Sequence, residues 1–371
     1  MIKLAYDSTK NADLFYKLRV FLSDPFFFLD TGEKQYVFLD RREFELVKQK
    51  NISATMEVVL REPLLLKAKQ RGNESDPLEN FVGYLVEEYG EQTEEVRVPF
   101  HFPLSLADFL RARGVRVIPV SSLYPEREQK IPSEIEAVRQ SIRKTEKAFA
   151  FVENILRESV IRGESIVFRG EMLTSEFLKM EAEKLLIQEG MVCQEGIIIS
   201  SGQQTAIPHH PGEGPILPNA PIVCDLFPRN RATGYFADIT RTFVKGTPSK
   251  KIEHMYDAVL EAQEAGMREA RAGKKGKDIH EACSRVLLAR GYDVGEKGFV
   301  HGAGHGVGLQ VHEGPRVGGN SQDELVAGNI ITIEPGLYYP EFGGIRIEDD
   351  ILVTDQAAEN LTVYPKRLVI P

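Results

Sequence analysis

Four acidic residues interrupt apolar, strand-like runs in the second half of this chain. Asp225 ends the run IVCD, Asp238 lies within YFADITRTF, Glu334 within IITIEPG and Glu348 within GIRIEDDILV. An ionised carboxylate in a buried strand is unfavourable unless it is paired or bound to a metal. One such residue could form an ion pair, but four in one region are accommodated more simply by shared divalent cations. We therefore expect the fold to bring these strands together around one site that holds two metal ions.

His305 is the histidine best suited to complete such a site. It lies in GAGHGVG, where glycines on both sides let the backbone approach closely. Neutral imidazole is a good ligand for Mn, Co or Zn. A second interpretation keeps the carboxylates in buried ion pairs, with Asp238 bound to Arg241 and Glu348 bound to Arg346. Such pairs account for single residues but not for the whole acidic set.

The overall charge and the absence of long apolar runs exclude several partners. The formal net charge is -9, whereas a nucleic-acid-binding surface would show a basic excess. No apolar run approaches the roughly 18 residues of a membrane span. The N-terminus lacks the apolar core of a signal peptide, and the three cysteines show no CxxC spacing. We expect a cytoplasmic protein that binds neither nucleic acid nor membrane.

The chain is expected to divide into two domains, 1–130 and 131–371. The segment SSLYPEREQKIP is polar, contains two prolines and precedes a strong helical pattern. In the first part, two apolar runs flank TGEK and predict a hairpin of residues 25–30 and 35–40. FVGYLVEEYG, SLADFLRARG and VRVIPV then predict a strand, a helix and a strand. The N-terminal part is therefore expected to be a small α/β domain.

The second part repeats an order of helices followed by strands, which suggests a duplicated α+β unit. Its first helix is predicted to begin at a Ser133–Glu136 capping box. Periodicity and stop signals predict the later elements. Helices are expected at 174–189, 249–271 and 276–289, and strands at 196–200, 222–227 and 235–244.

Five segments resemble the pita-bread metallopeptidases, and within them the proline-specific Xaa-Pro aminopeptidases and Xaa-Pro dipeptidases (prolidases). They are SGQQTAIPHH, VCDLFPRNRATGYFADITRTFVKG, HGAGHGVGLQVHEGP, TIEPGLY and GGIRIEDDILVT, in the order of the family and within residues 201–354. The resemblance implies an α+β fold. A catalytic domain with duplicated α/β halves around a curved antiparallel sheet would follow a smaller α/β domain.

The resemblance also implies which residues bind two divalent metal ions. Asp225 looks like the ligand that chelates the first metal. Asp238 and Glu348 look like bridges between both metals, and His305 and Glu334 look like ligands of the second. Manganese is the metal expected first, followed by cobalt or zinc.

Further residues match the family's substrate side. His209, His312 and Glu334 are expected to be catalytic, with Glu334 carrying a proton while remaining a ligand. His301 and Arg346 match the proline-specific branch and are expected to bind substrate, although Arg346 could instead brace a metal ligand. The expected substrates are short proline-containing peptides cleaved at the Xaa-Pro bond, and the expected assembly is a homodimer.

One turn departs from the family pattern. The usual D-x-G is replaced by Asp225-Leu226-Phe227-Pro228, and the arginines of the following PRNR turn, Arg229 and Arg231, are expected in a solvated loop. The choice between dipeptidase and aminopeptidase stays open, with the short segment after Glu348 slightly favouring a dipeptidase. Three competing hypotheses are a metal-free, creatinase-like hydrolase, a non-catalytic binding protein of this fold and a methionine aminopeptidase.

Overall fold

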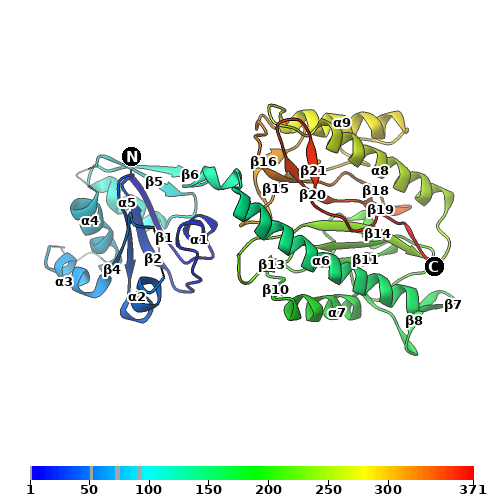
Figure 1. Cartoon of the computed structure of the whole chain (residues 1–371), viewed down its shortest axis with the longest axis horizontal. Coiled ribbons are helices and arrows are strands. Elements are labelled where there is room, and N and C mark those ends of the chain that lie inside the picture. The colour runs from blue at the N-terminus through cyan, green and yellow to red at the C-terminus, as the bar shows by residue number, and fades with distance from the viewer. Residues whose placement is uncertain (1, 51–52, 72–75, 91–92) are drawn as a thin grey trace. The chain divides into compact units, whose positions relative to one another are not determined.

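The computed structural model describes residues 2–50, 53–71, 76–90 and 93–371 (Figure 1). The chain forms two compact units, Met1–Pro125 and Glu126–Pro371, which are described separately below. Compactness alone does not show that a unit folds independently. The predicted division into domains at residue 130 therefore stays a prediction.

A mixed sheet is the centre of the first unit, with strand order β4-β3-β2-β1-β5-β6. Its strands are β1 (Ile2–Asp7), β2 (Phe26–Asp30), β3 (Gln35–Leu39), β4 (Met56–Leu60), β5 (Glu95–Pro99) and β6 (Arg116–Val120). The predicted hairpin is confirmed, since β2 and β3 pair antiparallel with Phe27 opposite Phe38. Phe27 and Phe28 belong to two different hydrophobic clusters, because successive side chains of a strand point to opposite faces. Burial on both faces explains why this run is continuously apolar.

The helices of the first unit include one segment that the sequence predicts as a strand. They are α1 (Ala12–Leu18), α2 (Arg41–Lys48), α3 (Arg61–Arg71), α4 (Pro77–Tyr89) and α5 (Leu104–Ala112). The strand prediction for residues 81–90 is wrong, because most of this segment lies in α4. Asp76 caps that helix by accepting a hydrogen bond from the Leu78 N–H at 2.7 Å, and Pro77 occupies its first turn. These start signals lie before the apolar run that favoured a strand.

Four long helices organise the second unit. They are α6 (Pro132–Glu158), α7 (Ser175–Gln188), α8 (Lys250–Glu269) and α9 (Gly276–Ala289). The last three confirm the predicted helices to within a few residues. The Thr174 hydroxyl caps α7 by accepting from the Phe177 N–H at 3.2 Å, and Gly190 follows the helix with a φ of 76°. Both residues satisfy backbone groups that a helix end leaves open.

The predicted capping box at the start of α6 is wrong. Ile131 is the N-cap residue and Pro132 occupies the first turn, so Ser133 lies inside the helix. The reciprocal contact comes from the Glu134 side chain, whose Oε2 accepts from the Ile131 N–H at 3.1 Å. Proline is well suited to the first helical position because it has no N–H to leave unpaired. Pro132 therefore moves the helix start ahead of the serine.

The second unit contains two larger sheets, each built mainly from one of the two successive runs of helices followed by strands. One has the order β11-β12-β14-β22 and the other β16-β15-β17-β20-β21, with β18 and β19 as a separate pair. These strands are β11 (Ile198–Ser201), β12 (Ile222–Leu226), β14 (Ile239–Lys245), β15 (Gly304–Gly306), β16 (Glu313–Val317), β17 (Ile330–Ile333), β18 (Gly336–Tyr339), β19 (Gly343–Arg346), β20 (Asp349–Val353), β21 (Ala358–Asn360) and β22 (Val369–Ile370).

Each sheet has its own pair of helices. Helix α6 packs against α7 and β14, and α7 packs against β11, whereas α8 packs against α9, β17 and β19, and α9 packs against β16. In Figure 1 the strands of these two sheets lie between the two helix pairs. The arrangement agrees with the duplicated α+β unit that the order of elements suggests.

Several short elements complete this unit. They are β7 (Val160–Arg162), β8 (Ser165–Phe168), β9 (Glu171–Met172), β10 (Met191–Val192), β13 (Arg229–Asn230) and the 3-10 turns η1 (Pro125–Glu128) and η2 (Gly202–Ala206). No helix among the residues that the structure describes is both long and apolar enough to cross a membrane.

Candidate metal centre

The four acidic residues converge where the two sheets of the second unit meet. Asp225 lies in β12, Asp238 directly precedes β14, Glu334 directly follows β17, and Glu348 lies between β19 and β20. The expectation of four carboxylates inside strands is therefore wrong for three of them. A residue just outside a strand is free of the strict alternation of side chains, so its carboxylate can turn towards a site between sheets.

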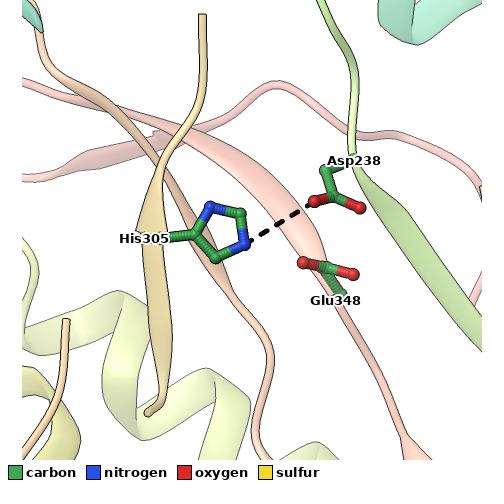
Figure 2. Close-up of side chains that lie close together, drawn as sticks. All are labelled: Asp238, His305 and Glu348. Carbon is green, nitrogen blue, oxygen red and sulfur yellow. Dashed lines mark ion pairs between the residues drawn. The ribbon is translucent and has the colours of Figure 1, made fainter. Parts of the chain in front are cut away.

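Asp238, His305 and Glu348 form the centre of the site. Their ligand atoms all lie within 4.8 Å of one another, and Figure 2 shows the three side chains approaching from separate parts of the chain. The His305 Nε2 lies 3.6 Å from Asp238 Oδ2 and 3.4 Å from Glu334 Oε1. Since His305 Nδ1 faces the Gly306 carbonyl oxygen at 3.2 Å, we assign the proton to Nδ1. The Nε2 lone pair then faces the carboxylates, which is the tautomer a metal ligand requires.

All five predicted ligands line one cavity of about 510 Å³, together with the other predicted site residues. Those others are His209, His301, His312 and Arg346. The ring centroids of His305 and His312 lie 4.2 Å apart. His210 is turned into the adjacent loop, where its Nδ1 accepts from the Gly212 N–H at 3.0 Å. The structure thus brings every predicted site residue to one place, while their individual roles stay predictions.

Burial disfavours the charged forms of the central groups. Burial and, after it, the neighbouring carboxylates raise the pKa of Asp238 and of Glu348 well above their usual values. Burial raises the pKa of Glu334 to about 8. Burial, followed by the nearby His312, lowers the pKa of His305 to about 3. A divalent cation would favour ionised carboxylates beside a neutral imidazole, whereas burial without a cation favours protonated carboxyl groups.

The two arginines close to these acidic residues in sequence make other ion pairs than the second interpretation suggested. Arg241 Nη2 donates to Asp349 Oδ1 at 2.8 Å, and Arg346 Nη2 donates to Asp225 Oδ2 at 2.7 Å. The alternative interpretation, which paired Arg241 with Asp238 and Arg346 with Glu348, is therefore wrong in its partners. The second oxygen of Asp225, Oδ1, is buried without a hydrogen-bond partner. An unpaired carboxylate oxygen beside three further acidic side chains fits a cation-binding site.

Arg346 is held by four hydrogen bonds to the protein. Its Nε donates to the Thr240 hydroxyl at 3.2 Å, and its Nη1 donates to the Pro208 carbonyl oxygen at 3.1 Å and to the Tyr338 hydroxyl at 2.9 Å. The fourth bond is the one to Asp225. Of the two roles that the resemblance leaves open, this geometry favours bracing the carboxylate of Asp225 over binding substrate.

Tyr338 extends this network to His301. The Tyr338 hydroxyl lies 2.9 Å from His301 Nε2, and His301 Nδ1 lies 2.7 Å from the Gly302 carbonyl oxygen. A carbonyl can only accept, so Nδ1 carries the proton and Nε2 accepts from Tyr338. Burial, followed by the charge of Arg346, lowers the pKa of His301 to about 4, which keeps the ring neutral. The hydrogen bonds therefore run in one direction, from Arg346 to Tyr338 and from Tyr338 to His301.

Three polar residues at the site escaped the sequence analysis. Thr240 donates its hydroxyl to Glu348 Oε2 at 2.7 Å, and Asp350 Oδ2 accepts from the Asp238 N–H at 3.0 Å. Tyr338 is the third. A signal existed for two of them, since Thr240 lies in the matching segment that contains Asp238, and Tyr338 ends the matching segment TIEPGLY.

The turn after Asp225 is partly buried rather than solvated. Arg229 is 5% exposed and its Nε donates to the Gly234 carbonyl oxygen at 2.9 Å, whereas Arg231 is exposed. The expectation of a solvated loop is thus wrong for Arg229. Phe227 from the same turn lines the cavity with Ile198 and Val311. The altered turn therefore contributes an apolar side chain to the cavity wall.

Gly304 lets β15 approach β17 closely enough to place His305. A Cβ atom at Gly304 would lie 2.0 Å from the Thr332 carbonyl oxygen. We expect Gly304→Ala to lower the free energy of unfolding by about 1–3 kcal/mol, the usual effect of overpacking, and to weaken metal binding. Gly295→Ala is the matched control, because Gly295 also has a positive φ of 113° but nothing within 4 Å of its Cβ position. Equal metal affinity in both variants, measured by titration calorimetry, would contradict the expected displacement of His305.

Comparison with known proteins gives a consistent set of likenesses. A model of metallopeptidase family M24 matches residues 136–355. An Xaa-Pro dipeptidase from Pyrococcus furiosus is 38% identical over 173 residues, which are 46% of this chain and 48% of that protein. The match thus spans about half the length of such curated relatives.

Solved structures extend the likeness over the whole chain. An Xaa-Pro dipeptidase from Bacillus anthracis superposes with a TM-score of 0.82 at 27% identity, covering 100% of this chain and 95% of that chain. An X-Pro aminopeptidase from Thermotoga maritima gives a TM-score of 0.77 at 26% identity, covering 100% and 97%. These likenesses confirm the expected fold class, a pita-bread α+β unit preceded by a smaller α/β unit.

Proposed function

Because this chain belongs to metallopeptidase family M24, we propose that it hydrolyses the bond between an N-terminal residue and a following proline in short peptides. The observation that carries the proposal is the convergence of Asp225, Asp238, His305, Glu334 and Glu348 on one cavity. The names of the similar proteins, Xaa-Pro dipeptidases and an X-Pro aminopeptidase, support the preference for proline.

We propose that these five residues hold two divalent metal ions, with manganese the first expectation, ahead of cobalt or zinc. Oxygen-rich sites with a single imidazole suit such ions. Bound cations would supply positive charge for the scissile carbonyl and an acidic water near neutral pH. The buried carboxylates and the neutral His305 are the groups on this chain that fit them.

The remaining cavity residues supply the other tasks. His312 and His209 would donate hydrogen bonds to the carbonyl oxygen as negative charge develops on it. Glu334 would pass a proton to the leaving proline nitrogen. Ile198, Phe227 and Val311 form an apolar wall that suits a proline ring.

Two competing functions lack a supporting observation of this kind. A metal-free, creatinase-like hydrolase would leave the buried acidic cluster without a counter-charge. A non-catalytic binding protein would not need the acidic cluster. Metal analysis of the purified protein separates these proposals. We expect about two divalent ions per chain, as in two-metal hydrolases generally, and loss of peptidase activity on chelation with recovery on adding Mn²⁺. Activity that persists after complete metal removal would refute the proposal.

We also propose a homodimer located in the cytoplasm. The cysteines support this location, because Cys193, Cys224 and Cys283 are free thiols in the structure, as is usual in a reducing compartment. Sedimentation velocity would test the dimer, and cell fractionation would test the location.

The state of Arg346 leads us to expect an aminopeptidase rather than a strict dipeptidase. A dipeptidase needs a cation for the free carboxylate of proline, but the one lysine or arginine among the described residues lining the cavity is Arg346, which is bonded to Asp225. Hydrogen bonds to charged groups contribute about 1.5–3 kcal/mol, so a carboxylate-binding site would favour dipeptides by roughly 10- to 100-fold. We expect no such preference in kcat/KM when Xaa-Pro and Xaa-Pro-Xaa peptides are compared. Xaa-Ala peptides are the control, and their equal hydrolysis would contradict proline specificity.

A further inference from the structure

A buried ion cluster holds Glu313, the residue that follows His312. Lys130 Nζ donates to Glu313 Oε1 at 2.7 Å, and Arg127 Nη1 donates to Glu313 Oε2. The side chains of Lys130, Glu313 and Arg127 are 0%, 1% and 6% exposed. The two cations come from the segment just before α6, whereas Glu313 begins β16. The cluster therefore joins two parts of the second unit that are far apart in sequence.

The same groups fix the loop between His305 and His312. The Gln310 N–H donates to Glu313 Oε2 at 3.3 Å, and Arg127 Nη2 donates to the Gln310 side-chain oxygen. A Cβ atom at Gly308 would lie 2.4 Å from Glu313 Oε1 and 2.9 Å from Lys130 Cε. The loop backbone thus packs directly on the ion cluster and has little room to shift.

The cationic segment is itself anchored. The Lys130 N–H donates to the Gly328 carbonyl oxygen at 2.8 Å, and the Asn329 side-chain amide donates to the Glu128 carbonyl oxygen at 2.9 Å. On the other side, Glu313 pairs with Gly306 across β15 and β16, next to His305. A displacement of Glu313 would therefore be transmitted to His305 and His312.

We propose that Arg127 and Lys130 clamp Glu313 and thereby position His312 in the cavity. The inference rests on the proposed peptidase function, and all three are positioning residues because none lines the cavity. Buried ion clusters contribute little net stability compared with apolar packing, so stability alone does not account for this one. Its place between an anchored segment and the loop of His312 gives it a geometric function.

The first test is a double-mutant cycle between Glu313→Gln and His312→Asn. A displacement of about 1 Å can slow an enzyme roughly 100-fold, so we expect Glu313→Gln to lower kcat by this order with KM nearly unchanged. In the His312→Asn background the same change should have almost no further effect, because the group that it positions is gone. Equal losses in both backgrounds would overturn the proposal.

The second test does not depend on activity. Hydrogen exchange of the amides of residues 307–312 should become faster in Glu313→Gln than in the unchanged protein. Glu153→Gln is the matched control, since Glu153 is also a buried glutamate and its partners Arg157 and Tyr364 lie outside the cavity lining. Unchanged exchange in Glu313→Gln would refute the clamp even if the protein proves to cleave no Xaa-Pro peptide.

A milder variant, which keeps one of the two ion pairs, provides a test if Glu313→Gln does not fold. Lys130→Met retains the contact between Arg127 and Glu313, so we expect it to show the same two effects at smaller size. A kcat and a loop exchange rate equal to those of the unchanged protein would count against the clamp. Faster exchange throughout the second unit, rather than in the loop alone, would do so as well.

Discussion

Glu348→Ala is expected to reduce kcat/KM for an Xaa-Pro peptide by more than about 100-fold, because even residues that only contact metal ligands contribute about 10- to 100-fold. Glu348 is one of the three residues whose ligand atoms lie within 4.8 Å of one another, so its loss opens the centre of the site. The number of bound divalent ions should fall below two per chain. Metal analysis and steady-state kinetics with added Mn²⁺ measure both effects.

The same variant should behave differently when stability is measured in a chelating buffer. Burial and the neighbouring acidic groups disfavour the ionised form of Glu348, so its removal relieves an unfavourable contact. We expect a melting temperature no lower than that of the unchanged protein under these conditions. A large loss of activity without a loss of stability would separate a functional carboxylate from a structural one.

Glu359→Ala is the matched control for this experiment. Glu359 lies in β21 and forms an exposed ion pair with Arg139, in which the Glu359 side chain is 49% exposed. Such pairs contribute about 0–1 kcal/mol, so metal content and kinetics should stay unchanged. Full activity or two retained metal ions in Glu348→Ala would disprove the two-metal centre.

The convergence of the acidic residues could be predicted without any knowledge of topology. The free energy of burying Asp225 or Glu348 is unfavourable wherever the chain places them, so apolar neighbours in the sequence were sufficient evidence. The partners of the arginines could not be predicted in this way. Arg346 is two residues from Glu348 but binds Asp225; β19 ends at Arg346, and Glu348 lies in the short link before β20. Pairing across sheets depends on where strands end, which local sequence does not specify.

The errors in local structure have a similar cause. The apolar residues Phe81 and Val82 favour a strand when read alone, but the cap at Asp76 and Pro77 starts a helix before them. Likewise Pro132 starts α6 ahead of Ser133. In both places a short terminal signal outweighs the pattern that follows it. The clamp around Glu313 also lay outside prediction, since its members are brought together only by the tertiary fold.

Arg346→Met is expected to lower the free energy of unfolding by about 3–5 kcal/mol, the usual effect of removing one partner of a buried ion pair. Arg346 is 3% exposed, and its loss leaves the Asp225 carboxylate and the Tyr338 hydroxyl without their donor. Denaturant titration measures this change. Arg285→Met on the exposed side of α9 is the control, with an expected change within about 0.5 kcal/mol.

Kinetics with two peptides then distinguish bracing from substrate binding. If Arg346 braces Asp225, the variant should lose kcat/KM for Xaa-Pro and Xaa-Pro-Xaa by the same factor, because the metal centre is altered for both. If Arg346 instead binds the free carboxylate of proline, KM should rise for the dipeptide alone and the free energy of unfolding should hardly change. The four hydrogen bonds of the guanidinium lead us to expect the first result. Thr240, Pro208, Tyr338 and Asp225 accept four of the five guanidinium hydrogens, so a substrate carboxylate would have to share Nη2 with Asp225 and compete for its brace.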